Sequence, residues 1–347
     1  MKVLFDIVHP AHVHFFRNLR TELEAAGHET LVVGRDKDVT LALLEAYDIP
    51  HLVHGRSGHT NMAAQAWELL SRDWFLARTA REFGADVLLT RNPAGAQAAR
   101  LARIPGVFDT DDGTAVGIHF AAAKPFAHWI TTPDCLTEDH GPRHVTYPSY
   151  KALAYLHPDR FTPDPAIRDE LGLGDDEPFF LVRFVAHDAS HDGAIEGLEA
   201  GTRQAVVDLL STHGRVAITS EGPLPPELEP HRMRVAPHRI HDVIATAAFT
   251  VGDSQTVAAE SACLGVPGFR LSSFSGRVDY LTEMEDEYGL VHNFRPGQDE
   301  ALLDALRAAV ADLDGLAEDA AERHARLLAD KVDLTTWYRE FVDRIVD

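Results

Sequence analysis

Three histidines stand directly after the first apolar run of the sequence. The run KVLFDIV is followed by HPAHVHFF, which carries His9, His12 and His14. An imidazole whose pKa lies near its free value of about 6.5 can take a proton from a hydroxyl group at neutral pH. We therefore predict that His12 is a general base, with a capping or packing role as the alternative. His9 and His14 are second choices, because Pro10 follows His9 and a helix is expected to include His14.

A second polar segment, RFVAHDASHD, follows the apolar run FFLVRFV. Arg183 alternates there with apolar residues of an expected buried strand, so its charge needs an anionic partner. The candidates for contacts with a phosphate or a sugar are Arg183, His187, Asp188 and Ser190. A structural network of arginine and aspartate is one alternative. A metal site is another, since two imidazoles and two carboxylates are competent ligands.

The segment VGDSQTVAAESACLGVP, residues 251–267, changes from an apolar run through a polar turn into an expected helix. A helix N-terminus presents unpaired backbone N–H groups and the positive end of the helix dipole, which suits an anion such as a diphosphate. Glu260, inside that helix, would then suit sugar hydroxyls. The alternative is that Asp253 and Ser254 only cap the helix, as such residues do in most proteins.

Two further segments carry polar side chains at expected strand ends. SSFSGR, residues 272–277, offers the hydroxyl of Ser275 and the cation of Arg277 as further partners for the same anion. DTDDGT, residues 109–114, contains three carboxylates that could ligate a metal ion. In a chain that is acidic throughout, a strand end and a turn are the simpler interpretation. We therefore predict no metal site.

Short apolar runs alternate with amphipathic stretches along the chain, as in strands and crossover helices of a parallel sheet. In the first half the expected strands are KVLFDIV, ETLVVG, PHLVH, DVLLT, GVFDT and HWITT, with helices near 15–26, 39–47, 63–83, 94 onward and 116–124. In the second half they are FFLVRFV, RVAITS, MRVAP, FTVGD and GFRLS, with helices near 199–211, 240–246, 256–264 and 278–288.

This order predicts an α/β protein with two Rossmann-like, doubly wound parallel sheets. The expected division is an N-terminal domain at 1–155, a proline-containing linker at 156–178 and a C-terminal domain at 179–330. A C-terminal helix at 331–347 could return to the first domain. Ligands of such folds bind at the carboxyl ends of the strands, so we expect the two domains to face a central cleft.

The 347 residues carry a formal net charge of −22, and only 5 of the 32 basic residues are lysine. This dispersed acidity argues against nucleic-acid partners and predicts a halophilic source with an acidic proteome. Two cysteines make neither a disulfide framework nor a zinc site. No apolar run reaches the ~20 residues of a membrane span, and MKVLFDIVHP lacks a signal-peptide pattern. We expect a cytoplasmic protein, for which peripheral membrane contact stays open.

The segments HPAHVHFF, YLHPDRFTPD, RFVAHDASHD and DSQTVAAESACLGVP, in this order, resemble the family catalogued as domain of unknown function 354. That family is grouped with the GT-B superfamily, which contains nucleotide-sugar glycosyltransferases and non-hydrolysing UDP-N-acetylglucosamine 2-epimerases. The resemblance implies that Ser254, Gln255 and Thr256 contact a diphosphate and that Glu260 binds the ribose. It also implies that His12 takes the place of the loop histidine in the transferase that completes lipid II. The glycine pairs of the transferases and of the epimerases are missing from the corresponding segments of this sequence.

The leading functional hypothesis is a metal-independent glycosyltransferase that uses a nucleotide sugar, expected to be UDP-linked, and no cofactor. A helix N-terminus with Arg183 or Arg277 would stabilise the leaving diphosphate in place of a metal. The acceptor would be a glycan or a lipid-linked molecule on the N-terminal domain. One alternative is a nucleotide-sugar 2-epimerase, in which Asp109 or Asp188 removes the proton at C2. The other is a non-catalytic nucleotide-sugar-binding protein of surface-polysaccharide assembly.

Overall fold

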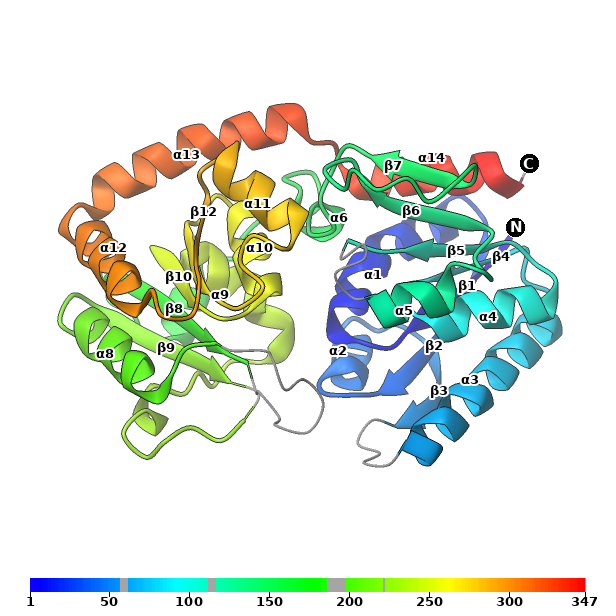
Figure 1. Cartoon of the computed structure of the whole chain (residues 1–347), viewed down its shortest axis with the longest axis horizontal. Coiled ribbons are helices and arrows are strands. Elements are labelled where there is room, and N and C mark those ends of the chain that lie inside the picture. Colours follow the sequence, from blue (N-terminus) through cyan, green and yellow to red (C-terminus); the bar gives the residue numbers. More distant parts are fainter. Residues whose placement is uncertain (57–61, 112–116, 186–196, 221, 347) are drawn as a thin grey trace. The chain divides into compact units, whose positions relative to one another are not determined.

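The computed structural model describes residues 1–56, 62–111, 117–185, 197–220 and 222–346. It divides into two compact units (Figure 1). Unit 1 comprises Met1–Tyr155 and Lys331–Asp347, and unit 2 comprises Leu156–Asp330. Each unit is built on one parallel sheet with helices on both faces, which confirms the predicted fold class.

The sheet of unit 1 has seven strands in the order β3-β2-β1-β4-β5-β6-β7, and all neighbouring pairs are parallel. The strands are β1 (Lys2–Ile7), β2 (Glu29–Asp36), β3 (His51–Arg56), β4 (Val87–Thr90), β5 (Gly106–Asp109), β6 (Trp129–Pro133) and β7 (His144–Tyr147). The order reverses between β1 and β4. Ligands of doubly wound sheets bind outside the carboxyl ends of the strands at such a switch point.

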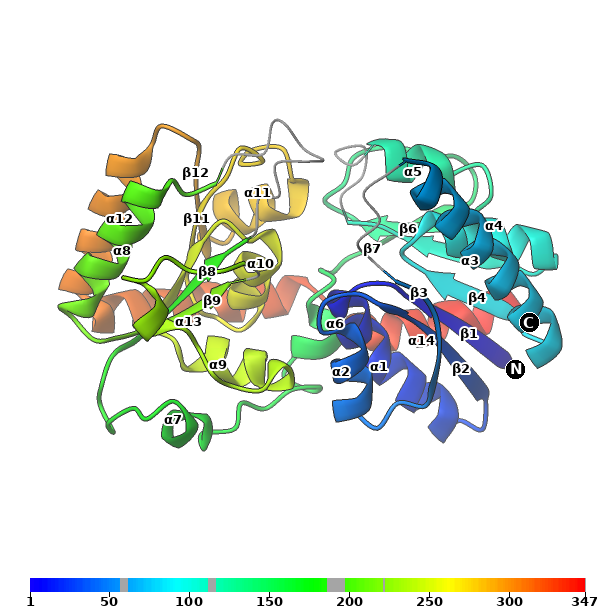
Figure 2. The same ribbon diagram turned by 90° about the horizontal axis from the view of Figure 1, so that it is seen from below.

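The helices of unit 1 form a layer on each face of this sheet, as the two views in Figures 1 and 2 show. One layer contains α1 (Pro10–Ala25), α2 (Thr40–Ala46) and α14 (Leu334–Val346). The other contains α3 (Met62–Phe83), α4 (Pro93–Ala102) and α5 (Gly117–Ala123). The crossovers between parallel strands are right-handed. Helices therefore cover one face where the chain moves across the sheet in one direction, and the other face where it moves in the opposite direction.

The C-terminal helix α14 is part of unit 1 and packs against α1, although unit 2 separates the two in sequence. Tyr338, Phe341 and Val342 are at most 2% exposed, because they lie on the apolar stripe of α14 that faces the core. The ring of Tyr338 contacts the ring of Phe15 edge to face, with 5.4 Å between the two centroids. The first helix therefore completes its packing only with residues from the far end of the chain.

The sheet of unit 2 has five strands in the order β12-β11-β10-β8-β9, again parallel at every pair. The strands are β8 (Phe179–Phe184), β9 (Arg215–Ser220), β10 (Phe249–Gly252), β11 (Gly268–Leu271) and β12 (Val291–Phe294). In Figure 1, α8 (Ala200–Ser211) and α12 (Asp299–Ala311) cover one face, and α9 (Ile240–Thr246), α10 (Gln255–Cys263) and α11 (Asp279–Asp286) cover the other. The long helix α13 (Leu313–Asp330) contacts α10 and α12. The short helices are α6 (Leu153–Leu156), α7 (Ile167–Glu170) and the 3-10 turns at Glu229–His231 and Pro237–Arg239.

Two predicted elements differ from the structure, and two strands of the structure were not predicted. Helix α1 begins at Pro10 and not near Phe15, because proline is tolerated in the first turn and His9 caps the helix through Nδ1. MRVAP is not a strand: it follows a single isolated bridge between Arg232 and Ile218 of the edge strand β9. The edge strands β7 and β12 lie outside the predicted set, since each has four residues with polar side chains among them.

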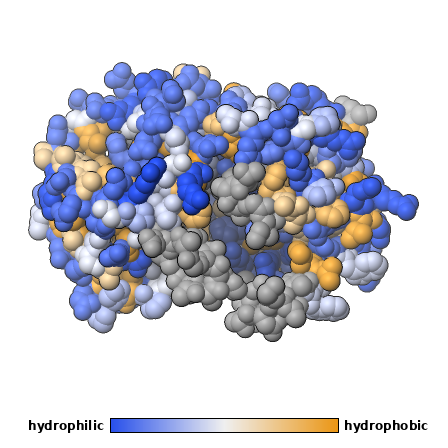
Figure 3. All heavy atoms as spheres, viewed as in Figure 1, coloured by the Kyte–Doolittle hydropathy of each residue, from blue (hydrophilic) through white to orange (hydrophobic). Residues whose placement is uncertain are grey.

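The expected linker at 156–178 belongs to unit 2, where Ile167 and Leu173 pack into the core beside Leu181 and Val243. In the part of the chain that the structure describes, none of the helices is both long enough and apolar enough to cross a membrane. The face of the molecule in Figure 3 is largely hydrophilic, with separate small hydrophobic patches.

Candidate functional site

A small pocket lies at the carboxyl ends of β8, β10 and β11 in unit 2, where α10 begins. It is partly open: its empty space of about 170 Å³ includes open solvent, and the enclosed part has room for about one water molecule. The lining residues are Arg183, Thr250, Val251, Gly252, Ser254, Val257, Ala258, Phe269 and Arg270. Two guanidinium groups and a helix N-terminus thus meet at the strand ends, where open α/β sheets bind their ligands. This arrangement suits an anion.

The turn from β10 into α10 is held by side chains of its own sequence. Ser254 is the N-cap of α10, and its Oγ accepts a hydrogen bond of 3.3 Å from the backbone N–H of Val257. Asp253 accepts a hydrogen bond of 2.7 Å from the N–H of Val185 and lies 3.6 Å from Arg203. Ser254 therefore caps α10, as the alternative interpretation has it, whereas Asp253 binds the end of β8 and does not cap the helix. The first N–H groups of a helix have no partner within the helix itself, so a ligand can bind to them.

Gly252 lets the strands of the pocket approach each other closely. A Cβ atom at this position would lie 2.1 Å from the carbonyl oxygen of Arg183, a distance that real side chains do not adopt. Only glycine fits between β8 and β10 at this point, because it has no Cβ. The glycine thereby sets the spacing between Arg183 and the start of α10.

Arg183 projects from β8 with its side chain half-buried. Its Nη1 donates a hydrogen bond of 2.5 Å to Oγ1 of Thr219, on the neighbouring strand β9. Arg183 lines the pocket, and its contact with a phosphate or a sugar stays a prediction. His187, Asp188 and Ser190, from the same predicted segment, lie outside the described residues.

Arg270 is a lining residue that the sequence interpretation missed. It is 1% exposed and projects from β11, one strand beyond β10. Nη1 donates to Oδ1 of Asn293 at 3.1 Å and to Oγ of Ser275 at 3.4 Å. Burial lowers the pKa of Arg270 to about 10, so the side chain is still cationic at neutral pH.

The other described candidates for phosphate contacts are not among the residues that line the pocket. Gln255 and Thr256 follow Ser254 in the first turn of α10 and are half-buried. Ser275 is 4% exposed and donates a hydrogen bond of 2.8 Å to the carbonyl oxygen of Phe294. Its hydroxyl oxygen also accepts a hydrogen bond from Arg270, so it helps to orient that side chain. Arg277 is exposed.

Glu260, the predicted ribose ligand, is 4% exposed and faces a histidine. Its Oε1 lies 3.1 Å from Nε2 of His241, which is 1% exposed. A buried carboxylate needs such a hydrogen-bonding partner to offset the loss of water. The contact ties α10 to α9, and a ribose hydroxyl would have to bind beside it.

The predicted base His12 lies in the first turn of α1, at the carboxyl end of β1, and not in a loop. Its Nδ1 is buried and has no hydrogen-bond partner among the described residues. Burial and then the charge of Arg91 hold the pKa of His12 well below 6.5, with smaller contributions from His9 and Lys151. The imidazole is therefore neutral at pH 7 and can accept a proton.

The other two histidines of this segment have structural roles. Nδ1 of His9 accepts a hydrogen bond of 3.2 Å from the N–H of Ala11 as the cap of α1. His14 is 4% exposed, and its ring contacts the rings of Tyr47 and Tyr155. Of the three, His12 alone has a buried ring nitrogen without a partner in the described part of the chain.

The carboxylates of Asp109 and Asp111 are engaged in a buried ionic network. Arg91 forms ion pairs with both, and Lys151 lies 2.8 Å from Asp111. The hydroxyl of Tyr338, from α14, also donates to Asp109. Although burial raises the pKa of Asp111, the charges of Arg91 and Lys151 lower it further, and the net shift is downward. Asp112, the third carboxylate of DTDDGT, lies outside the described residues.

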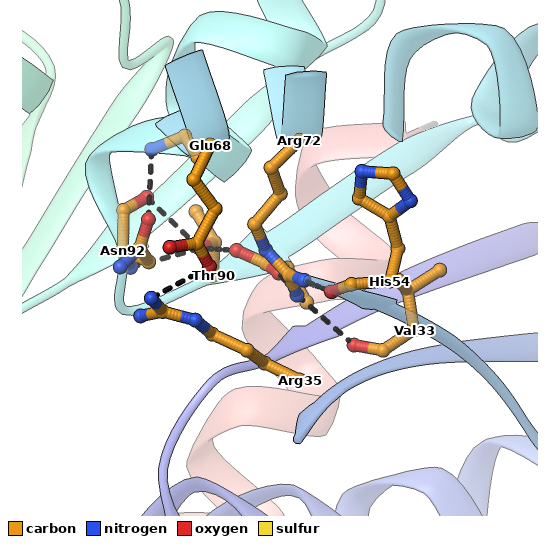
Figure 4. A network of polar contacts seen from close by, with 9 residues as sticks. Val33, Arg35, His54, Glu68, Arg72, Thr90 and Asn92 are labelled. Carbon is orange, nitrogen blue, oxygen red and sulfur yellow. Dashed lines mark hydrogen bonds and ion pairs between the residues drawn. The ribbon is translucent and has the colours of Figure 1, made fainter. Parts of the chain in front are cut away.

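A second buried network attaches α3 to the sheet of unit 1 (Figure 4). Arg72 of α3 forms an ion pair with Asp6 of β1 and donates to the carbonyl oxygens of His54 and Val33. Thr90 donates to the second oxygen of Asp6 at 2.8 Å. The charges of Arg72 and Asp6 are thus matched within the same unit, so the cluster explains packing and not ligand binding.

The carboxyl group of Asp73, the next residue of α3, is 6% exposed. Its Oδ1 has no hydrogen-bond partner among the described residues. Burial, followed by the negative charge of Asp6, raises the pKa of Asp73 to about 7. The group is thus close to half-protonated in neutral solution.

No protein-family model and no curated protein sequence matches the chain. The assignment to the family of unknown function 354 therefore stays a prediction. Solved structures of similar fold include S. aureus MnaA with UDP, which is 14% identical with a TM-score of 0.68 over 96% of this chain and 94% of that one. UDP-GlcNAc 2-epimerase from Neisseria meningitidis, bound to UDP-GlcNAc, is 13% identical with a TM-score of 0.63 over 92% and 94% of the chains.

Glycosyltransferases show the same similarity. Spinosyn forosaminyltransferase SpnP is 15% identical to this chain, with a TM-score of 0.67 over 100% of this chain and 99% of that one. At such identities the similarity is one of fold. The chain has the GT-B fold, which these transferases and the UDP-GlcNAc 2-epimerases share.

Proposed function

We propose that the protein is a nucleotide-sugar enzyme and, more specifically, a metal-independent glycosyltransferase. The observation that carries this proposal is the pocket of unit 2, where Arg183, Arg270 and the N-terminus of α10 surround one small space. A glycosyl transfer from a nucleotide sugar develops negative charge on the leaving diphosphate. Fixed cations and backbone N–H groups stabilise such a charge without a metal ion. Unit 2 would therefore bind the nucleotide, with UDP as the first ligand to test.

His12 of unit 1 supports the transferase over the alternatives. A transferase needs a base for the acceptor hydroxyl. A neutral imidazole with a buried nitrogen that no described residue hydrogen-bonds meets that need. We accordingly assign the acceptor, a glycan or a lipid-linked molecule, to unit 1. No cofactor is needed in this scheme, because the nucleotide sugar is itself the activated substrate.

A 2-epimerase is the second candidate, and the similarity in fold to the Neisseria meningitidis enzyme favours it. That reaction needs a carboxylate or an equivalent base to remove the proton at C2. Asp109 is poorly suited, since Arg91, Thr131 and Tyr338 already occupy its oxygens. A non-catalytic nucleotide-sugar-binding protein is the third candidate.

Incubation with UDP-sugars separates the three candidates. Release of UDP that depends on an added acceptor indicates a transferase. Conversion of one UDP-sugar into its C2 epimer without release of UDP indicates an epimerase. Binding of UDP in calorimetry with neither reaction indicates a binding protein, and a failure to bind any nucleotide sugar would contradict the whole proposal.

A further inference from the structure

Arg270 is a buried cation whose hydrogen bonds are incomplete. The side chain is 1% exposed, yet its Nε and Nη2 have no hydrogen-bond partner among the described residues. Only Nη1 is engaged there, and both of its acceptors are neutral oxygens, one from Asn293 and one from Ser275. Burial lowers the pKa of Arg270 more than the attraction of Tyr280, Asp253 and Glu285 raises it, so the buried guanidinium is on balance costly.

The charges of Asp253 and Glu285 attract the guanidinium and relieve only part of this cost. In the described part of the chain no ion pair involves Arg270, in contrast to Arg203, which lies 3.6 Å from Asp253. Asp253 also accepts from the backbone of Val185. Glu285 accepts two hydrogen bonds from Asn293, at 2.7 and 2.9 Å, and so holds the amide that orients Arg270. The guanidinium is positioned by its neighbours, but the attraction of the nearby carboxylates does not outweigh its loss of water.

Arg270 and the N-terminus of α10 face the same space. The pocket that Arg270 lines is also lined by Gly252 and Ser254, the last residue of β10 and the cap of α10. An anion in this pocket would meet the positive end of a nine-residue helix together with Arg270, which forms no ion pair in the described part of the chain. These two features have different origins in the sequence, and each attracts negative charge.

We infer that Arg270 binds a phosphate group of the ligand of unit 2 and completes its own hydrogen bonds only when that anion is present. This deepens the proposed function and rests on it for the identity of the ligand. The positive charge that contacts the phosphate would then come from a buried residue of β11, which Asn293 and Ser275 hold in place. Without the anion the protein carries an unpaired charge in its core, and binding removes that cost.

The test compares Arg270→Met with Arg307→Met, which removes the same charge from the exposed face of α12. Melting temperature is measured without ligand, and binding of UDP and of inorganic pyrophosphate is measured by calorimetry. We expect Arg270→Met to melt at or above the temperature of the unaltered protein, because an unpaired buried charge is gone. Its affinity for both ligands should fall about 10- to 100-fold, as for loss of a charged hydrogen-bonded contact. Arg307→Met should bind both ligands normally.

The two proposals fail in different ways. Unchanged affinity together with a lower melting temperature in Arg270→Met would make Arg270 a structural residue, and the proposed function would stand if UDP still bound. Binding of pyrophosphate that depends on Arg270, without binding of UDP, would retain the anion site and reject the nucleotide. If neither ligand binds the unaltered protein, both proposals are wrong. Should Arg270→Met not fold, Arg270→Gln, which keeps a polar side chain, is measured with the same expected loss.

Discussion

The imidazole of His12 combines a buried nitrogen without a partner among the described residues and a pKa held well below 6.5. A base with an ordinary histidine pKa loses activity about tenfold per pH unit below pH 6.5. Because burial and Arg91 disfavour the imidazolium, His12 stays in its active neutral form at lower pH. We expect kcat/KM of the transferase to be flat from about pH 8 to below pH 6.5, and His12→Ala to lose about 10²–10⁴-fold in turnover.

The control for His12 is the exposed His213 of unit 2, whose replacement by alanine should leave turnover unchanged. Affinity for UDP should survive in His12→Ala, since we assign the nucleotide to unit 2. Near-normal turnover in a folded His12→Ala protein would mean that the base lies elsewhere, with His187 and Asp188 as the next residues to replace.

Glu260 has two possible roles that a conservative substitution separates. Glu260→Gln retains an oxygen that can accept the hydrogen bond of His241, so the contact between α10 and α9 should persist. If the carboxylate also binds ribose hydroxyls, UDP affinity should fall by about 1–3 kcal/mol in calorimetry. A folded Glu260→Gln protein with unchanged UDP affinity would leave Glu260 with only its contact to His241.

The sequence pointed to Arg183 but not to Arg270, although the same signal marks both. Each arginine stands between apolar residues of a short central strand, FFLVRF for Arg183 and GFRL for Arg270. The polar segment SSFSGR follows Arg270, but the sequence interpretation chose Ser275 and Arg277 from it. That Arg270 has only neutral oxygens as acceptors becomes visible only in the structure, where Asn293 and Ser275 supply them. For Asp109 the sequence suggested a catalytic carboxylate, whereas the structure shows it hydrogen-bonded to Tyr338. Tyr338 is too far away in the sequence for this contact to be predicted.

At the scale of elements, Asp73 weakens the attachment of α3 to the sheet when it ionises. Its pKa is about 7 in the folded protein against an ordinary aspartate value of 3.8, so the folded protein binds the proton more tightly than the unfolded chain does. Stability therefore falls as the pH rises from about 4 to 7, and the penalty is complete above that range. Asp73→Asn should raise the melting temperature near pH 8 and change it little near pH 4. Asp176→Asn, at an exposed loop position, is the control and should be neutral at both.

The two pH values make this prediction easy to contradict. If Asp73→Asn changes the melting temperature equally near pH 4 and near pH 8, the substitution acts through packing. If Asp73→Asn lowers the melting temperature near pH 8, the ionised carboxylate of Asp73 is stabilising, through its attraction to Arg72.

Most elements could be predicted because their apolar periodicity is local. The strands β1, β4, β8 and β10 are continuous buried runs, and α3 and α8 lie within a residue of the expected bounds. The edge strands β7 and β12 could not be predicted, since half-exposed residues such as His144 and Asn293 weaken the apolar signal. The start of α1 depended on His9 acting as a cap, for which histidine is not a usual residue.

At the scale of the whole molecule, the net charge of −22 predicts a dependence on salt. Like charges at this density repel one another until salt screens them. The largely hydrophilic face in Figure 3 agrees with a surface on which such charges are spread. We expect the melting temperature to rise between low and molar KCl. A melting temperature that is indifferent to KCl would remove the argument for a halophilic source.

The return of α14 to unit 1 has a consequence for synthesis on the ribosome. Unit 1 needs residues 331–347, and all of unit 2 is translated between Tyr155 and Lys331. At about 5–20 residues per second this interval lasts on the order of ten seconds. During it the apolar side of α1 that Tyr338 later covers stays open to water and to chaperones. The usual order of co-translational folding is therefore inverted, and unit 2 can reach its final form before unit 1 does.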